Sequence, residues 1–316
     1  MTTPTNAPFD PALARASELA LTAWNVGMVA AADGQIHSAH GLTCAYHPQP
    51  FALPGTHHTL HLTPAADLTT GLDAAHAFYR ERSSAIWCTL GPALSPPTAR
   101  VALKSRGWRY HFTGISMAAD LDSIPERPTP PGVTITTATA QTFTHTEAHP
   151  YYGQLTNAPA AQSLRASLAL TAERPTRAWN FVALINGQPV ATALMILIGG
   201  EIAGIFDVGT LPDYRRQGLV SAVIRAALHR ARDLGYRTAV LQCDAPLIRV
   251  FGPLGFRQVG WLEHWVYPAD APTHTTNTTL EEFINAATSN RPATAPALLR
   301  AQPELPPPDQ ASSTVN

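Results

Sequence analysis

The segment from Arg215 to Ser221, RRQGLVS, places two arginines and a glycine between an apolar stretch and a long amphipathic stretch. The preceding EIAGIFDV predicts a strand, and the apolar positions after Gly218 recur at the spacing of a helix. Backbone amides at the start of a helix are free donors, and glycine lets an anion approach them closely. The segment therefore predicts a pyrophosphate-binding turn; a capped surface helix with solvated arginines is the other interpretation.

An acidic residue lies immediately before this turn. Asp207 stands in the otherwise apolar EIAGIFDV, and a carboxylate is seldom buried unless it is paired. A carboxylate beside a reacting amine can take its proton, so Asp207 is a candidate general base. The alternative is a structural role, in which Asp207 pairs with an arginine such as Arg215 or faces solvent. The weaker candidates for chemistry are Cys243, Asp244, Glu263 and His264.

Turn signals and periodicity predict the elements that position these residues. Residues 180–208 predict three strands, joined at Asn186-Gly187 and at Gly199-Gly200. Apolar positions from Leu219 to Leu234 lie on one helix face. A buried strand (RTAVLQC), a short helix (PLIRVFGPLG) and closing strands (FRQVGWLEHWVY) follow. Upstream, HPYYG is interpreted as the lining of an acceptor pocket or as a connecting loop.

Residues 133–270 resemble the GCN5-related N-acetyltransferase (GNAT) family. The family's signature, [Q/R]-x-x-G-x-[G/A], reads RRQGLV from Arg215 to Val220, and LIRVFGPLGFRQVG resembles its short late helix and Leu-Gly-Phe turn. The resemblance implies an α/β (α+β) fold, with a mixed, mostly antiparallel sheet flanked by helices. It implies acetyl-CoA or another acyl-CoA as donor, and no metal. The implied acyl-CoA-binding residues are Val208, Arg215, Arg216, Gln217, Gly218, Leu219, Val220 and Ser221.

The sequence departs from the family's pattern at two positions. Val220 stands where the signature ends in Gly or Ala, so its branched side chain either crowds the phosphates or faces the core. Phe251 stands where many members have a tyrosine that protonates the departing thiolate, and a phenylalanine has no proton to donate. A CoA thiolate can leave unaided near neutral pH, so the loss of that tyrosine need not abolish activity, although it removes the easiest assignment of a proton donor.

Proline-rich and low-complexity segments suggest the domain organisation. The prediction is a degenerate GNAT-like domain without a CoA motif over 1–124, a Pro-rich linker over 125–132 and a GNAT acetyltransferase domain over 133–270. Residues 286–316 are rich in Ala, Pro, Thr and Gln and predict a disordered tail.

Two internal sequence similarities suggest the degenerate copy. LKSRGWRYHFTGISM repeats the pattern of FGPLGFRQVGWLEHW, so that Gly107-Trp108 matches Gly255-Phe256. WNVGMVAAADGQ, from Trp24, echoes WNFVALINGQ, from Trp179. Such a copy would cover the sheet edge and shape the acceptor cleft; an unrelated α+β domain is the alternative.

The composition limits the kinds of partner and the cellular compartment that can be expected. The formal net charge is −1 and 14% of residues are charged, which predicts no nucleic-acid or membrane-surface binding. Three separated cysteines predict reduced thiols in a cytoplasmic protein, and no signal peptide or membrane-spanning run is recognised. The histidines in GTHHTLH (His57, His58 and His61) are interpreted as a solvated loop or strand edge, with no metal site.

The resemblance to the GNAT family, taken with these features, implies an acyl-CoA-dependent N-acyltransferase, with acetyl-CoA as the expected donor and a small-molecule amine as acceptor. The alternative is a catalytically inactive GNAT-like protein that binds acyl-CoA or a metabolite as a sensor. Within enzymes, a decarboxylase or an O-acyltransferase is a lesser option. The expected assembly is a monomer or a homodimer.

Overall fold

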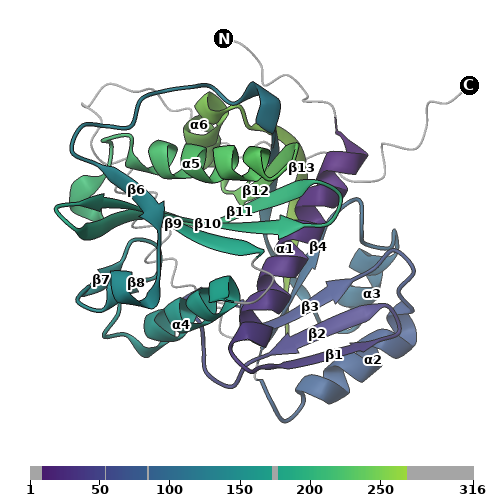
Figure 1. Ribbon diagram of the computed structural model, residues 1–316. Helices are drawn as coiled ribbons and strands as arrows, with labels where there is room; N and C mark the ends of the chain where they lie inside the picture. The colour runs from purple at the N-terminus through teal and green to yellow at the C-terminus, as the bar shows by residue number, and fades with distance from the viewer. Residues whose placement is uncertain (1–8, 54, 84, 173–176, 269–316) are drawn as a thin grey trace, which may run out of the picture. The chain divides into compact units, whose positions relative to one another are not determined.

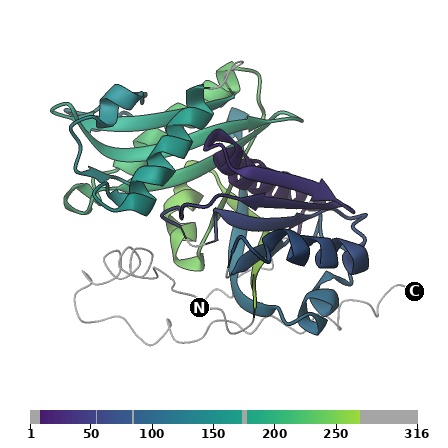
Figure 2. The same cartoon turned by 90° about the horizontal axis from the view of Figure 1, so that it is seen from below.

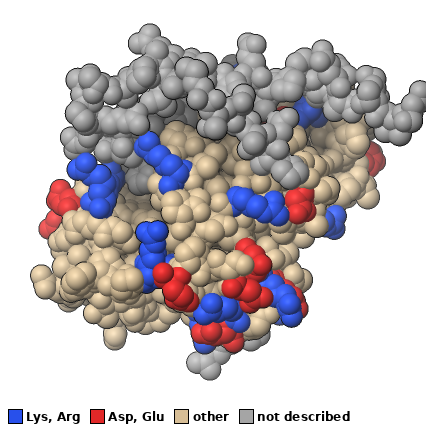
Figure 3. All heavy atoms as spheres, turned by 90° about the horizontal axis from the view of Figure 1, so that it is seen from above, with Lys and Arg blue, Asp and Glu red and all other residues tan. Residues whose placement is uncertain are grey.

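The computed structural model describes residues 9–53, 55–83, 85–172 and 177–268. These described residues belong to one compact unit, and the predicted tail, 286–316, lies outside them. None of the helices in the described ranges is long and apolar enough to cross a membrane. Basic and acidic side chains are interspersed on the face drawn in Figure 3, and most of its described surface is uncharged.

The helices and strands fall into two halves. The N-terminal half contains α1 (Pro11–Ala31), β1 (Gln35–Ala39), β2 (Leu42–Tyr46), β3 (His58–Leu62), α2 (Leu68–Tyr79), β4 (Ile86–Leu90), α3 (Ala99–Ser105) and β5 (Arg109–Asp120). The C-terminal half contains β6 (Thr134–Thr137), β7 (Ala148–His149), β8 (Gly153–Gln154), α4 (Ala158–Ala172), β9 (Ala178–Ile185), β10 (Gln188–Ile198), β11 (Ile202–Thr210), α5 (Leu219–Asp233), β12 (Thr238–Cys243), α6 (Ile248–Phe251) and β13 (Arg257–Tyr267).

One large sheet runs through both halves (Figure 1). Its strand order within the described residues is β1-β2-β3-β4-β13-β5-β12-β11-β10-β9-β6. The β3–β4 and β11–β12 pairs are parallel, and the other pairs are antiparallel. The predicted mixed, mostly antiparallel sheet flanked by helices is therefore confirmed.

The last strands of the two halves are exchanged. β13 lies between β4 and β5, and β5 lies between β13 and β12. Each half thus supplies a strand that pairs with the penultimate strand of the other. The division into a 1–124 domain and a 133–270 domain stays a prediction, and the two segments share this sheet.

Alternate residues of the central strands face different layers. Met117 and Ala119 of β5 pack in the core beneath α5, whereas Ala118 between them packs in the core beneath α1 and α4. α1 and α4 lie side by side on this second face (Figure 2). A third core joins α2 and α3 to β2, β3 and β4. Helix α1 therefore shares a core with β11, the strand that carries Asp207.

The predicted hairpins are present. Asn186 and Gly187, with φ of 52° and 79°, form the turn between β9 and β10, as a two-residue hairpin with positive φ at both positions requires. The next turn has its positive φ angles at Gly200 and Glu201, one residue later than expected. The predicted apolar helix face is confirmed except at Leu234, which lies beyond the end of α5 and is 39% exposed.

The two halves repeat one order of elements. β1-β2-β3-α2-β4-α3-β5 has the same order as β9-β10-β11-α5-β12-α6-β13. Gly107 and Gly255, with φ of 80° and 93°, each stand shortly before the last strand, as their sequence echo suggested. The echo from Trp24 to Trp179 is wrong, because Trp24 lies in α1 and Trp179 lies in β9. That the N-terminal half is a degenerate GNAT copy stays a prediction.

The prediction of a solvated histidine segment is wrong for His61. β3 is an interior strand, so His61 is 6% exposed, and its ring nitrogens bond the hydroxyls of Thr22 and Thr59 at 3.3 and 3.1 Å. Burial lowers its pKa to about 4. In the part of the chain that the structure describes, no three His, Cys, Asp or Glu side chains are grouped to hold a metal.

Candidate active site

Asp207 occupies a β-bulge in β11. Thr192 of β10 pairs with Gly209 and Leu194 pairs with Phe206, so Asp207 and Val208 together oppose one residue of β10. The φ of Asp207 is 50°, a left-handed value that non-glycine residues adopt rarely. A bulge re-aims the side chains on either side of it, and here it accompanies a carboxylate directed into the layer of α1 and α4.

The carboxylate of Asp207 is enclosed by aromatic side chains. Asp207 is 3% exposed, and its Oδ2 accepts a hydrogen bond of 2.6 Å from the hydroxyl of Tyr152. The ring of Trp24 stacks on Phe206, with centroids 5.2 Å apart. Burial raises the pKa of Asp207 to about 7, although the Tyr152 hydroxyl and the Trp24 indole each lower it. Exposure to solvent, one alternative for this residue, is thereby excluded.

The segment that brings Tyr152 to Asp207 is HPYYG, residues 149–153. His149 Nδ1 accepts the backbone N–H groups of Tyr151 and Tyr152 at 3.1 and 3.2 Å, which fixes the turn between β7 and β8. This turn lies against Gly209 of β11, where a Cβ would overlap the backbone of Pro150 and Tyr151. The sequence signalled a pocket or a loop here, but nothing in it pairs Tyr152 with Asp207.

The strands β11 and β12 pair over a short length. Their parallel pairing covers Ile202–Gly204 and Thr238–Val240 in the described part of the chain. β11 continues to Thr210 and β12 to Cys243, so Asp207 follows the paired part of β11 and Asp244 follows the end of β12. Burial raises the pKa of Asp244. Beyond Gly204, the edge of β11 that faces β12 is therefore not paired with it.

The predicted pyrophosphate turn has the conformation that an anion site needs. Gly218 is the N-cap of α5 with φ of 77°, and Arg216 has φ of 63°. Because glycine has no side chain, residue 218 puts no oxygen of its own over the first amides of α5. A Cβ at Gly218 would lie 3.8 Å from Pro130 Cγ. Successive amides in turns of this kind form concave anion sites.

The other residues of the turn divide between core and surface. Leu219 is buried, and Val220 packs against the core beneath α5. Arg215 donates its Nε to the carbonyl oxygen of Thr210 at 3.3 Å, and Gln217 donates to the carbonyl oxygen of Asp213 at 3.5 Å. The Val220 side chain therefore has a place in the core, away from an anion at the amides.

At the corresponding helix start in the N-terminal half, a side chain covers the first backbone amides. α2 follows β3 as α5 follows β11, and its N-cap is Asp67. The carboxylate of Asp67 accepts the backbone N–H groups of Thr69 and Thr70 at 3.0 and 3.1 Å. A negative side chain on these amides takes the place that an external phosphate would need. Of the two helix starts, α5 is the one suited to an anionic ligand.

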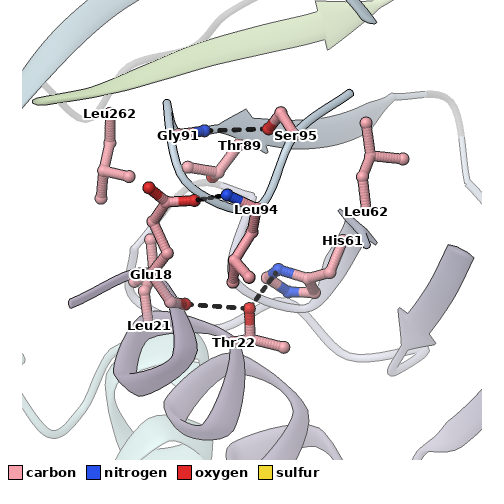
Figure 4. A pocket seen from close by; sticks show the side chains of 10 residues that line it. All are labelled: Glu18, Leu21, Thr22, His61, Leu62, Thr89, Gly91, Leu94, Ser95 and Leu262. Atoms are coloured by element: carbon pink, nitrogen blue, oxygen red, sulfur yellow. Dashed lines mark hydrogen bonds between the residues drawn. The ribbon is translucent and has the colours of Figure 1, made fainter. Parts of the chain in front are cut away.

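A second polar site lies beside α1, near the loop after β4 (Figure 4). Glu18, 6% exposed, accepts the backbone N–H groups of Ala93 and Leu94 at 2.9 and 2.7 Å. The hydroxyl of Thr22 donates to the carbonyl oxygen of Glu18 and bonds His61. Burial raises the pKa of Glu18, while the two amides lower it. The carboxylate therefore ties α1 to the loop after β4.

Replacing Glu18 with alanine should destabilise the fold. The change leaves one buried and one partly buried amide without their charged acceptor, which is expected to lower the free energy of unfolding by about 1.5–3 kcal/mol. Denaturant unfolding measures this loss. Glu81→Ala, at an exposed position after α2, is the matched control and should stay within about 0.5 kcal/mol of wild type. Equal stability of Glu18→Ala and the control would contradict the assignment.

Comparison with known proteins identifies relatives of this arrangement. Residues 141–256 match the model of the acetyltransferase (GNAT) family. The chain is similar to the solved structure of a GCN5-related N-acetyltransferase from Kribbella flavida, at 18% identity over 83% of this chain and 98% of that one, with a TM-score of 0.57. It is also similar to a GCN5-related N-acetyltransferase from Sphaerobacter thermophilus, at 16% identity over 72% and 76% of the two chains, with a TM-score of 0.50. No match is found among the curated proteins. The structural similarity confirms the predicted fold.

Proposed function

Because residues 141–256 match the model of the acetyltransferase (GNAT) family, we propose that the protein is an acyl-CoA-dependent N-acyltransferase with acetyl-CoA as donor. The observation that carries the proposal is the setting of Asp207. It is a buried carboxylate on β11, at the point where β11 has lost its pairing with β12 and shortly before the open start of α5.

The conformation of the turn before α5 supports acetyl-CoA as the donor substrate. The amides of residues 216–221 would hold its pyrophosphate, because glycine at 218 leaves them uncovered and Arg216 adds positive charge. The β11 backbone beside Val208 would pair with the pantetheine arm. Bound there, acetyl-CoA supplies an activated acyl group as a thioester.

Asp207 is proposed as the general base. It would accept a proton from the attacking amine, a role that requires the ionised carboxylate. Its enclosure between Tyr152 and Trp24 supports a small-molecule amine as acceptor rather than a long polypeptide.

A monomer or homodimer in the cytoplasm is the proposed setting of the protein. Cys44, Cys88 and Cys243 are free and buried, which is compatible with a reducing compartment.

A sensor function is the second candidate, and one observation favours it. Phe251, at the position of the family's proton donor, is 5% exposed and packs edge-on against Phe256 with centroids 6.3 Å apart. The position is filled by a core residue. A protein that binds acyl-CoA without turning it over would need no donor there.

Turnover and binding measured together separate the two functions. Free thiol release from acetyl-CoA against a panel of small amines should give multiple turnovers, and calorimetry should show acetyl-CoA binding. Tight binding with thiol release at background across the panel would support the sensor. No binding at all would contradict both.

The rate should depend on pH through Asp207. Its raised pKa keeps the carboxyl protonated, and unable to act as a base, until the pH approaches about 7. We therefore expect kcat/KM to rise with pH on a limb centred near 7 and to level off above it. The limb should remain when an amine acceptor of different pKa is used; a limb that moves with the pKa of the amine would assign it to the substrate instead.

A further inference from the structure

The HPYYG turn carries a second tyrosine whose surroundings differ from those of Tyr152. Tyr151 is partly buried, its Cα lies against Gly209 of β11, and its ring meets that of Tyr152 edge-on with centroids 5.4 Å apart. The Tyr152 hydroxyl is committed to Asp207 at 2.6 Å. The phenol of Tyr151 is thus the tyrosine hydroxyl of this turn that is left to act on something else.

Tyr151 lies beside the part of β11 that no longer pairs with β12. After burial, the carboxylates of Asp207 and Asp244 are what raise its pKa. Asp207 lies on β11 and Asp244 follows β12. Gly209, against which Tyr151 packs, lies beyond Gly204, where β11 has stopped pairing with β12, and the ring of Tyr151 contacts that of Tyr152, which holds Asp207. The thioester is proposed to lie beside this part of β11.

We propose that Tyr151 donates the proton to the departing thiol sulfur, in place of the tyrosine that Phe251 lacks. The inference rests on the proposed acyltransferase function and assigns its proton donor. It takes the donor from the β7–β8 turn on the face of α1 and α4, whereas Phe251 belongs to α6.

The proposed step balances within the site. The amine nitrogen bonds to the thioester carbonyl carbon, the carbon–sulfur bond breaks, and its electron pair goes to sulfur. Asp207 takes a proton from the amine nitrogen, and the sulfur takes the phenol proton of Tyr151. The Asp207 carboxyl then returns its proton to the Tyr151 oxygen. The products are an amide and a free thiol, and both side chains regain their starting protonation.

The two tyrosines should therefore differ in function. Tyr152 is a positioning residue, because it acts through Asp207; its loss should shift the pH limb of the rate. Tyr151 would contact the departing sulfur, so its loss should lower kcat and leave that limb in place. The burial of Tyr151 and its carboxylate neighbours keep the phenol protonated over the whole working range.

The test is the Tyr151→Phe variant assayed with two acetyl donors. With acetyl-CoA, whose alkyl thiolate is a poorer leaving group than an aryl thiolate, kcat should fall about 100-fold at unchanged KM. With an aryl thioacetate, whose thiol leaves readily as the anion, the ratio of variant to wild type should lie near one. Tyr110→Phe, on an exposed position of β5, is the matched control and should keep the wild-type rate with both donors.

A second variant tests the same assignment in the opposite direction. Adding Phe251→Tyr to Tyr151→Phe should restore at least 10-fold of the lost kcat with acetyl-CoA, and circular dichroism should report that both variants are folded. Wild-type turnover that survives Tyr151→Phe, or a loss of equal size with both donors, would overturn the inference and leave the proposed function standing. Absence of wild-type turnover would overturn both.

Discussion

Replacing Gly218 with aspartate is expected to abolish acetyl-CoA binding. The new carboxylate would stand at the N-cap of α5, where it can accept the amides that the pyrophosphate needs, as Asp67 does in α2. The carboxylate would also repel the phosphates. In addition, any residue with a Cβ is less stable than glycine at the φ of 77° that position 218 adopts. We expect calorimetry to show a loss of at least about 100-fold in affinity, which corresponds to roughly 2.7 kcal/mol.

The matched control for this change is Gly187→Asp. Gly187 also has positive φ, at 79°, and its added Cβ would meet open space in the β9–β10 turn. The control therefore carries a similar backbone cost without a charge at α5. Acetyl-CoA affinity in Gly218→Asp equal to that of Gly187→Asp, with both proteins folded, would exclude the α5 turn as the pyrophosphate site.

Asp207→Asn is expected to lower turnover by roughly 10²–10⁴-fold, the usual contribution of a positioned general base. Asparagine keeps the shape of the side chain and an oxygen that accepts the Tyr152 hydroxyl, but it cannot take a proton at neutral pH. Acetyl-CoA affinity should remain within about 3-fold of wild type, since no phosphate contact is proposed for this residue. Asp233→Asn, at the exposed end of α5, is the control and should retain the wild-type rate.

The stability of the same variant should change with pH in a defined direction. The folded pKa of Asp207, about 7, lies above its ordinary value of 3.8. Folding therefore favours the protonated carboxyl. The contribution of this group to the free energy of unfolding is full below pH 3.8 and is lost as the pH rises through about 7. Relative to wild type, Asp207→Asn should gain stability between pH 4 and 8 in urea titrations. A rate unchanged per folded molecule, with lower stability at pH 8, would instead assign Asp207 a purely structural role.

Local patterns in the sequence were sufficient for the β9–β10 hairpin and for α5. Asn186-Gly187 dictates a hairpin because both residues tolerate positive φ, and the apolar spacing after Gly218 dictates α5. The position of Gly218 at the junction of strand and helix follows from these two signals. The same local reasoning failed at Trp24, where a resemblance in residue types hid the difference between a helix and a strand.

The surroundings of Asp207 could not be read from the chain in the same way. Its hydrogen-bond partner, Tyr152, is 55 residues away, and the Trp24 indole approaches from the other half. These contacts depend on how α1 and the β7–β8 turn pack on the sheet, which no local period encodes. His61 was misjudged for a related reason, since a Thr-rich polar segment looks solvated until its neighbours β2 and β4 are known.

The exchange of final strands has a consequence for the protein while it is being made. β4 has β3 on one side and must wait for β13 on the other, and β5 must wait for both of its neighbours. At the usual speed of a ribosome, the last of these strands follows β5 after on the order of 10 seconds. The nascent chain therefore carries exposed strand edges for that interval, and such edges can recruit other chains. Newly synthesised copies should depend on chaperones more than their modest length suggests.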